Sequence, residues 1–344
     1  MKKTVWLAAA CFCVALIAFS GNVAQGIRQA FLLCTDVLIP SVFPFMALTC
    51  IAGAASATGN SGKVGRFFSK VFCIPASTVG VWAFSMLGGY PVGASMSAQL
   101  LERGEITAPQ SKTLTLICFN AGPAFVINAL GMGMLGSKKA GAVVFAGVCT
   151  AAVLTGAVAG RIYKPDLRVG KTVNNTNADG MAQAVVQGVY TAGRNMLGIC
   201  AWVLFFSALI SLVLMFPVKK EVQDVAVMLL EITQGCARGA AGLSLPAVAA
   251  FVSFGGVCVL CQVLSIAQRS AVKLSEILIT RAFSAAVAYA VTGALLKIFP
   301  VEAAVNVNAS FDTVMPYSHS VASAVMLMIL CVILIFDLDT KQKV

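Results

Sequence analysis

Apolar runs long enough to cross a lipid bilayer recur along this chain, and this feature constrains its fold more than any other. A spanning α-helix needs about 20 mostly apolar residues, because the hydrocarbon core offers its backbone groups no outside hydrogen-bond partner. Of the 344 residues, 59% are apolar and 11% are charged, whereas a soluble domain carries about 25% charged residues. A soluble enzyme, a disordered chain and a disulfide-stapled secreted domain are excluded, and the sequence predicts an all-α polytopic membrane protein.

Eight apolar runs are expected to form full transmembrane helices: Val5–Phe19, Phe31–Ala55, Thr113–Leu135, Gly141–Tyr163, Met196–Phe216, Leu245–Ala267, Leu278–Phe299 and Val321–Phe336. We interpret the first run as an uncleaved helix rather than a signal peptide, because it is long for a signal sequence and further spans follow. Two more apolar stretches, Val71–Leu101 and Val222–Gly242, are interrupted by Gly, Pro or polar residues. Irregular backbone survives at membrane depth only inside protein or along a cavity, so these stretches are predicted to be re-entrant hairpins.

The net charge of +11 agrees with this topology. With Lys2 and Lys3 in the cytoplasm, 17 of the 24 basic residues, Arg281 among them, fall on the cytoplasmic side, and of the seven on the outer side Lys138 and Lys139 fit the topology least well. Because cytoplasmic loops of membrane proteins are enriched in Lys and Arg, we expect a multi-pass protein of the cell membrane with both termini in the cytoplasm. The chain has no arginine-rich arm, so the excess charge indicates contact with anionic lipid rather than nucleic acid.

In this topology the two hairpins enter the membrane from opposite sides, and the helices around them run in opposite senses. This is an inverted-topology repeat, the plan of many secondary transporters. The longest polar stretch, with Asn174–Asn177 at its centre, then serves as a linker between the repeats. The expected parts are an N-terminal helix (1–29), a first repeat (30–163), a cytoplasmic linker (164–185), a second, inverted repeat (186–300), and an outer loop with the last helix and tail (301–344).

Interruptions recur at matching places in the two halves. Gly88–Gly93 lies in the first hairpin and Phe119–Pro123 breaks the next span, while Glu231–Gly235 lies in the second hairpin and Ser253–Gly256 breaks the span after it. Paired interruptions of this kind indicate a binding site near the membrane midplane, although any single glycine also serves close helix packing. The residues expected to shape the helix breaks are Gly93, Gly122, Pro123, Gly235, Gly255 and Gly256. The residues expected to contact a substrate are Gln99, Asn120, Asn128, Glu231, Thr233, Gln234 and Gln262.

Glu231 is the acidic residue of greatest interest, because a carboxyl group in an apolar segment is costly and usually faces a cavity, a partner or a coupling ion. It could bind substrate hydroxyls or carry a proton. The alternatives are an ion pair with Arg238 or a shallower position than the one drawn. Coupling to sodium or to protons is compatible with the sequence, since backbone carbonyls bind the first and Glu231 could carry the second.

No set of residues indicates catalysis, a metal or a cofactor. Cys258 and Cys261 form a CxxC pair without a second Cys or His pair, so core packing is expected for them. His319 is the only histidine, and the chain has no motif for nucleotide, zinc or serine-hydrolase chemistry. We therefore do not expect an enzyme or a pump driven directly by ATP.

Several segments together resemble the sporulation integral membrane protein YlbJ family, within the wider group that carries the nucleoside-recognition Gate domain. The resemblance is carried by Leu38–Phe45, Gly88–Ala94, Phe119–Pro123 with Gly131–Gly133, Leu230–Gly235, Ser253–Gly256 and Gln262–Leu264. It implies a bacterial multi-pass transporter, distantly similar in plan to concentrative nucleoside transporters. It also implies, for a spore former, movement of dipicolinate across the membrane around the forespore.

The expected function is thus secondary transport of a small polar, anionic aromatic solute by alternating access, with dipicolinate as the specific candidate. Helix N-termini and amides at the breaks suit such an anion, whereas Glu231 would have to be neutral, paired or turned away. A nucleoside carrier is the alternative within transport, because a carboxyl group and amides also suit ribose hydroxyls and base edges. A membrane scaffold for sporulation that transports nothing is the alternative from another class.

Overall fold

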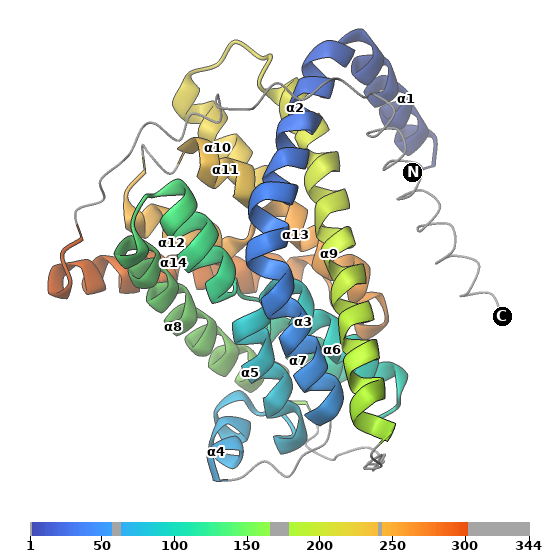
Figure 1. The fold of residues 1–344 in the computed structure, drawn as a ribbon, viewed down its shortest axis with the longest axis vertical. Coiled ribbons are helices and arrows are strands. Elements are labelled where there is room, and N and C mark those ends of the chain that lie inside the picture. The colour runs from blue at the N-terminus through green and yellow to red at the C-terminus, as the bar shows by residue number, and fades with distance from the viewer. Residues whose placement is uncertain (1, 57–62, 166–178, 240–242, 302–344) are drawn as a thin grey trace. The chain divides into compact units, whose positions relative to one another are not determined.

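The computed structural model describes residues 2–56, 63–165, 179–239 and 243–301, and it is helical throughout these ranges apart from short connections. These residues belong to the compact unit Met1–Asn306. The helices of the first half are α1 (Lys2–Ala18), α2 (Ser20–Leu33), η1 (Cys34–Leu38), α3 (Ile39–Ser56), α4 (Lys63–Phe72), η2 (Ala76–Thr78), α5 (Val79–Gly88), α6 (Tyr90–Glu102), α7 (Ala108–Ile117), η3 (Ala124–Met134) and α8 (Lys138–Tyr163). Those of the second half are α9 (Asp179–Val213), α10 (Lys220–Leu230), α11 (Ile232–Gly239), α12 (Leu245–Phe254), α13 (Gly256–Ile266), η4 (Gln268–Ser270) and α14 (Leu274–Ile298). Figure 1 shows their arrangement.

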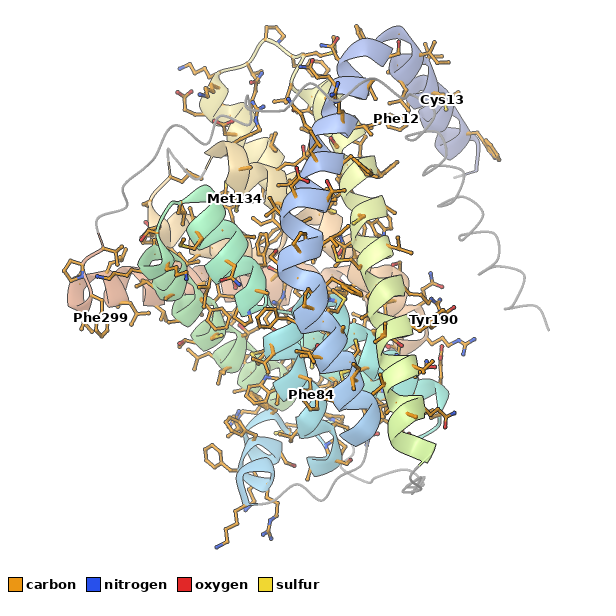
Figure 2. All side chains as sticks on the ribbon, viewed as in Figure 1. Phe12, Cys13, Phe84, Met134, Tyr190 and Phe299 are labelled. Carbon is orange, nitrogen blue, oxygen red and sulfur yellow. The ribbon has the colours of Figure 1, made fainter. Side chains whose placement is uncertain are left out.

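The structure supports the membrane-helix character of the chain. Five helical segments within the described residues are long and apolar enough to cross a bilayer: Ser20–Gly53, Lys138–Tyr163, Ala182–Val213, Leu245–Ile266 and Leu274–Ile298. A bent pair, Gly65–Phe72 with Ala76–Gly88, adds a sixth if it counts as one span. Large apolar side chains project outward from these helices: Val186 and Tyr190 on α9 are 71% and 60% exposed. Figure 2 shows Tyr190 on the outer side of α9. Exposed apolar surface on this scale is what a lipid-facing protein presents.

Some of the predicted spans match observed helices and others do not. Five of the eight match the long apolar segments, while Val321–Phe336 lies outside the described residues. The run Val5–Phe19 forms the separate 17-residue helix α1. The run Thr113–Leu135 is not continuous, because α7 ends at Ile117 and η3 begins at Ala124. The count of eight spans therefore stays a prediction.

Helix α9 begins earlier than the sequence analysis placed it. It starts at Asp179, inside the stretch 164–185 that was expected to be a linker, and runs for 35 residues. The segment that follows Asp179 contains Ala182, Gln183 and Ala184, which have high helix propensity. Local propensity thus extends the helix beyond the apolar run from which its start was predicted.

Two pairs of long helices form the framework on which the remaining elements pack. Helix α3 packs along α9, and α8 packs along α14; Figure 1 shows α2, α3 and α9 side by side. Glycines permit the close approach at both crossings. A Cβ atom on Gly188 of α9 would lie 2.5 Å from the Cα of Ile51, and one on Gly147 of α8 would lie 2.0 Å from the Thr292 hydroxyl oxygen. Small residues at helix crossings are a common means of association between membrane helices.

The crossing of α3 with α9 leads to the first prediction. Replacing Gly188→Ala forces a methyl group into the α3 backbone and should lower the free energy of unfolding by about 1–3 kcal/mol, the usual cost of overpacking. Gly193→Ala in the same helix is the matched control, because a Cβ atom there meets nothing within 4 Å. That control should be neutral or stabilising by up to about 1 kcal/mol, since alanine favours a helix. Thermal unfolding of the detergent-purified variants measures both, and equal Tm values would contradict the crossing.

Candidate functional site

Each of the two hairpins and two interrupted spans contains a helix break, and in the first half the two breaks touch. The hairpin of α5 and α6 turns at Gly89, whose φ of +83° is a conformation that glycine adopts without strain. A Cβ atom on Gly89 would lie 3.1 Å from the backbone nitrogen of Gly122, and one on Gly122 would lie 2.7 Å from the Leu87 carbonyl oxygen. The hairpin turn and the break between α7 and η3 therefore pack backbone against backbone.

The second half repeats this contact with different residues. Helix α10 ends at Leu230 and α11 begins at Ile232, so Glu231 is the break in the second hairpin. Gly255 and Gly256 separate α12 from α13, with φ values of +91° and +73°. A Cβ atom on Gly256 would lie 3.3 Å from the carbonyl oxygen of Leu229 and 3.4 Å from the nitrogen of Ile232.

Aromatic side chains connect the breaks of the two halves. The rings of Tyr90 and Phe119 meet edge to face, with centroids 5.2 Å apart. A Cβ atom on Gly255 would lie 3.1 Å from the Phe119 ring and 3.5 Å from the Tyr90 ring. The Tyr90 hydroxyl donates a hydrogen bond to the carbonyl of Val252, in the last turn of α12. The four breaks thus meet at one place, which we call the helix-break junction: Gly89–Tyr90, Phe119–Pro123, Glu231 and Gly255–Gly256.

Arg281 of α14 lies at this junction and is 2% exposed. Its guanidinium group donates hydrogen bonds to the carbonyls of Phe119 and, at 3.3 Å, Leu116, at the C-terminal end of α7. It also lies over the Phe119 ring, 4.5 Å from the centroid. From the sequence, Arg281 was expected among the charges of the cytoplasmic side; in the structure its side chain is enclosed by protein rather than exposed at a surface. An arginine inside an apolar span is itself an indication of a functional site, and that signal could have found it.

Glu231 is 1% exposed and caps the second short helix of its hairpin. One carboxyl oxygen accepts from the backbone N–H of Thr233 at 3.0 Å and the other from that of Gln234 at 2.6 Å. These are the N–H groups that have no partner inside a helix at its N-terminus. The expected alternative, an ion pair with Arg238, is not formed, because Arg238 pairs with Asp224 at 3.6 Å.

Two predicted amides bring unpaired polar atoms to the interior. Asn120 is 1% exposed, and its Nδ2 donates to the neighbouring Ala121 carbonyl at 3.2 Å. Its Oδ1 is buried without a hydrogen-bond partner among the described residues, and so is the Nε2 of Gln234. Gln262 is also buried, but its Nε2 already donates to the Cys258 sulfur at 3.4 Å. A buried polar atom without a partner costs about 1–3 kcal/mol, which makes Asn120 and Gln234 candidates for ligand contact.

Other predicted site residues lie elsewhere. The Asn128 side chain is exposed on η3 and does not join the junction. Gln99 lies nine residues after Tyr90 on α6, roughly 14 Å along the helix axis. It is half-buried and lines a cavity of about 20 Å³ beside Arg103, Gln187 and Thr191, room for about one water molecule.

Two of the glycines expected to break helices do not do so. Gly93 lies inside α6 and Gly235 inside α11. A Cβ atom on Gly93 would lie 2.7 Å from the Ser85 Cβ of α5, and one on Gly235 would lie 2.3 Å from the Met228 Cα of α10. Both glycines therefore permit close packing within their hairpins, and the breaks fall at neighbouring residues.

The junction presents four kinds of recognition group within the described residues: a guanidinium, an aromatic pair, unpaired amide atoms and the backbone ends of interrupted helices. Such groups suit a small solute that carries negative charge and hydrogen-bonding atoms. Within the same residues, no group of three or more His, Cys, Asp or Glu side chains could hold a metal ion.

Comparison with known proteins gives no match: no protein-family model, no curated protein and no solved structure matches this chain. The resemblance carried by the sequence motifs therefore stays a prediction. The function has to be argued from the geometry of the junction.

The capping role of Glu231 makes the second prediction. Glu231→Ala removes the acceptors for two backbone N–H groups and should lower the free energy of unfolding by about 1–2 kcal/mol, as loss of a helix N-cap does. Glu231→Asp should recover most of this loss, because aspartate is a preferred N-cap residue. Glu221→Ala, which removes an exposed acid from the first turn of α10, is the control and should change the Tm little. Equal Tm values for Glu231→Ala and Glu221→Ala would contradict the cap.

Proposed function

We propose that this chain is a secondary membrane transporter for a small polar, anionic aromatic solute and that the helix-break junction binds the solute. The observation that carries the proposal is the contact among breaks from both halves of the chain, made by Gly89 with Gly122 and by Gly255 with Tyr90 and Phe119. Interrupted helices that meet inside a membrane protein are typical of solute sites in transporters, because their ends supply unpaired N–H and C=O groups.

The order and the contacts of the helices support an inverted repeat. The sequence of a hairpin, an interrupted span and a long helix occurs as α5–α6, α7–η3, α8 and again as α10–α11, α12–α13, α14. Equivalent helices pair with each other, α3 with α9 and α8 with α14, and one set of cross contacts is reciprocal, α6 with α13 and α11 with η3. A two-fold relation between the halves predicts this pattern. Alternating access would then be a rocking of one repeat against the other around the junction.

The chemistry of the junction favours an aromatic anion. The Arg281 guanidinium offers a fork of N–H donors for a carboxylate, and the Tyr90–Phe119 pair offers ring contacts. Dipicolinate, which the family resemblance implies, carries two carboxylates on a planar ring and is our specific candidate. The carboxyl oxygens of Glu231 are held by the N-terminus of α11, so this residue has a structural role beside such an anion.

A nucleoside is the second candidate, favoured by the unpaired atoms Asn120 Oδ1 and Gln234 Nε2, which suit base edges and ribose hydroxyls. A scaffold that transports nothing would need no buried charge at a helix break, so Arg281 argues against it.

The proposed location is the cell membrane with both termini in the cytoplasm, and for a spore former the forespore membrane. Either sodium or protons could drive the cycle.

The proposal is tested by uptake into proteoliposomes with labelled dipicolinate and a labelled nucleoside as separate substrates. Asn120→Leu replaces a buried amide by an apolar side chain of similar size. It should change the Tm little, because the unpaired Oδ1 is removed together with the Nδ2 donor of the Ala121 carbonyl, while uptake falls at least about tenfold, the equivalent of 1.4 kcal/mol.

Asn128→Leu is the matched control, because the Asn128 amide is exposed on η3, and its uptake should equal that of the original protein. Equal uptake by the Asn120 and Asn128 variants would remove the junction as the transport site. Absence of uptake of either substrate by the original protein, under sodium and under proton gradients, would contradict the transport proposal itself.

A further inference from the structure

Arg281 has different surroundings from the described basic residues that form ion pairs. Lys112, Arg103, Arg238 and Arg269 each pair with a carboxylate within 4 Å. Arg281 is the most deeply buried of these basic residues, and no carboxylate among the described residues pairs with it. Its partners among the described residues are two backbone carbonyls and the face of one aromatic ring.

Those partners compensate the charge only in part. The C-terminal end of α7 carries a partial negative charge, equivalent to roughly half an elementary charge for a complete helix. The two hydrogen bonds engage two of the five N–H donors of the guanidinium group. Removing a full positive charge from water without a counterion is among the most costly arrangements in a protein interior. A carboxylate bound beside Arg281 would supply the missing charge.

The neighbours of Arg281 indicate what else such a carboxylate would carry. The guanidinium carbon of Arg281 lies over the Phe119 ring, and the Phe119 and Tyr90 rings meet edge to face. The residue after Phe119 is Asn120, whose Oδ1 has no partner among the described residues. A planar ring that bears a carboxylate would place its charge on Arg281 and its ring beside the aromatic pair.

We propose that Arg281 is the residue that makes the helix-break junction select carboxylates over neutral aromatic solutes. Its guanidinium fork binds a solute carboxylate through two parallel hydrogen bonds, which a lysine at the same place could not reproduce. This inference rests on the proposed function, in that it assigns charge selection at the proposed solute site to one side chain on α14.

The test measures binding to the full-length protein in detergent by thermal stabilisation. The probes are pyridine-2,6-dicarboxylate and its neutral isostere pyridine-2,6-dicarboxamide, each titrated over a range of concentrations so that Kd follows from the shift in Tm. The original protein should bind the dicarboxylate at least about tenfold more tightly, because a buried charge-assisted pair is lost with the amide. Arg281→Gln should abolish this preference, mainly by weakening the dicarboxylate.

Glu276→Gln is the matched control, because it breaks the ion pair between α14 and Lys112 without touching the junction. It should lower the Tm of the unliganded protein and leave the preference for the dicarboxylate intact. A purely structural role for Arg281, as a cap of α7, predicts that Arg281→Gln behaves in the same way. Retention of the full preference by Arg281→Gln would therefore overturn the inference.

Arg281→Lys keeps the test decisive if Arg281→Gln does not fold. Lysine retains the charge but not the fork, so the dicarboxylate should bind about fivefold or more weakly while binding of the dicarboxamide is nearly unchanged. An unchanged ratio of the two Kd values in Arg281→Lys, or no preference in the original protein, would overturn the inference.

Uptake into proteoliposomes separates this inference from the transport proposal. Anion-selective binding that depends on Arg281, combined with no uptake of any substrate, would contradict transport and leave the assignment of Arg281 in place. Uptake of the dicarboxylate by the original protein and by Arg281→Gln with the same selectivity would support transport and overturn the assignment.

Discussion

The structure depends on how it satisfies the backbone at interrupted helices. Each break leaves N–H or C=O groups without a partner inside the helix, and these groups have no access to bulk water in an apolar interior. Three side chains form hydrogen bonds with such backbone groups. Glu231 caps the N-terminus of α11, Arg281 caps the C-terminus of α7, and Tyr90 binds the Val252 carbonyl near the end of α12. The acid lies at an N-terminus and the base at a C-terminus, as the helix dipole favours.

Two of these caps cross between the halves, and they do so reciprocally. Tyr90 follows the hairpin break of the first half and binds the interrupted span of the second, whereas Arg281 comes from the second half and binds the interrupted span of the first. Glycine makes these bonds possible, because Gly89 and Gly255 let one break approach the other without an intervening side chain. The polar ends of the half-helices are thus held by side chains of the opposite half.

The positions of the breaks could be predicted from sequence, whereas the directions of the side chains could not. Gly89, Gly122 and Gly255 lie in Gly- and Pro-containing interruptions, and such residues act through local backbone conformation. Asn128 was expected at the junction, but its side chain is exposed on η3, a segment wound as a π-helix, and the residue pattern did not predict this local winding. Arg281 was missed because a basic residue near the start of an apolar run also fits a cytoplasmic charge, and only the burial of its side chain and its hydrogen bonds at the end of α7 separate the two interpretations.

The role of Glu231 also could not be predicted from the sequence alone. A carboxyl group between two apolar helices predicts a ligand or proton site and also fits a helix cap, and the common cap residues are shorter. The geometry shows the cap, with both carboxyl oxygens directed at backbone N–H groups.

The distribution of polar contacts also bears on how such a protein could move. The crossing of α3 with α9 is made at Gly188 and Ile51, and that of α8 with α14 at Gly147 and Thr292, whose hydroxyl has no hydrogen-bond partner among the described residues, so a shift at these contacts breaks no hydrogen bond. The hydrogen bonds of Tyr90 and Arg281 cannot shift in this way, because breaking them leaves backbone carbonyls without a partner in an apolar interior. In the proposed cycle the relative positions of the halves are therefore set at the helix-break junction rather than along the framework. A solute carboxylate that binds the remaining N–H donors of Arg281 would act on the contact that holds the two halves together.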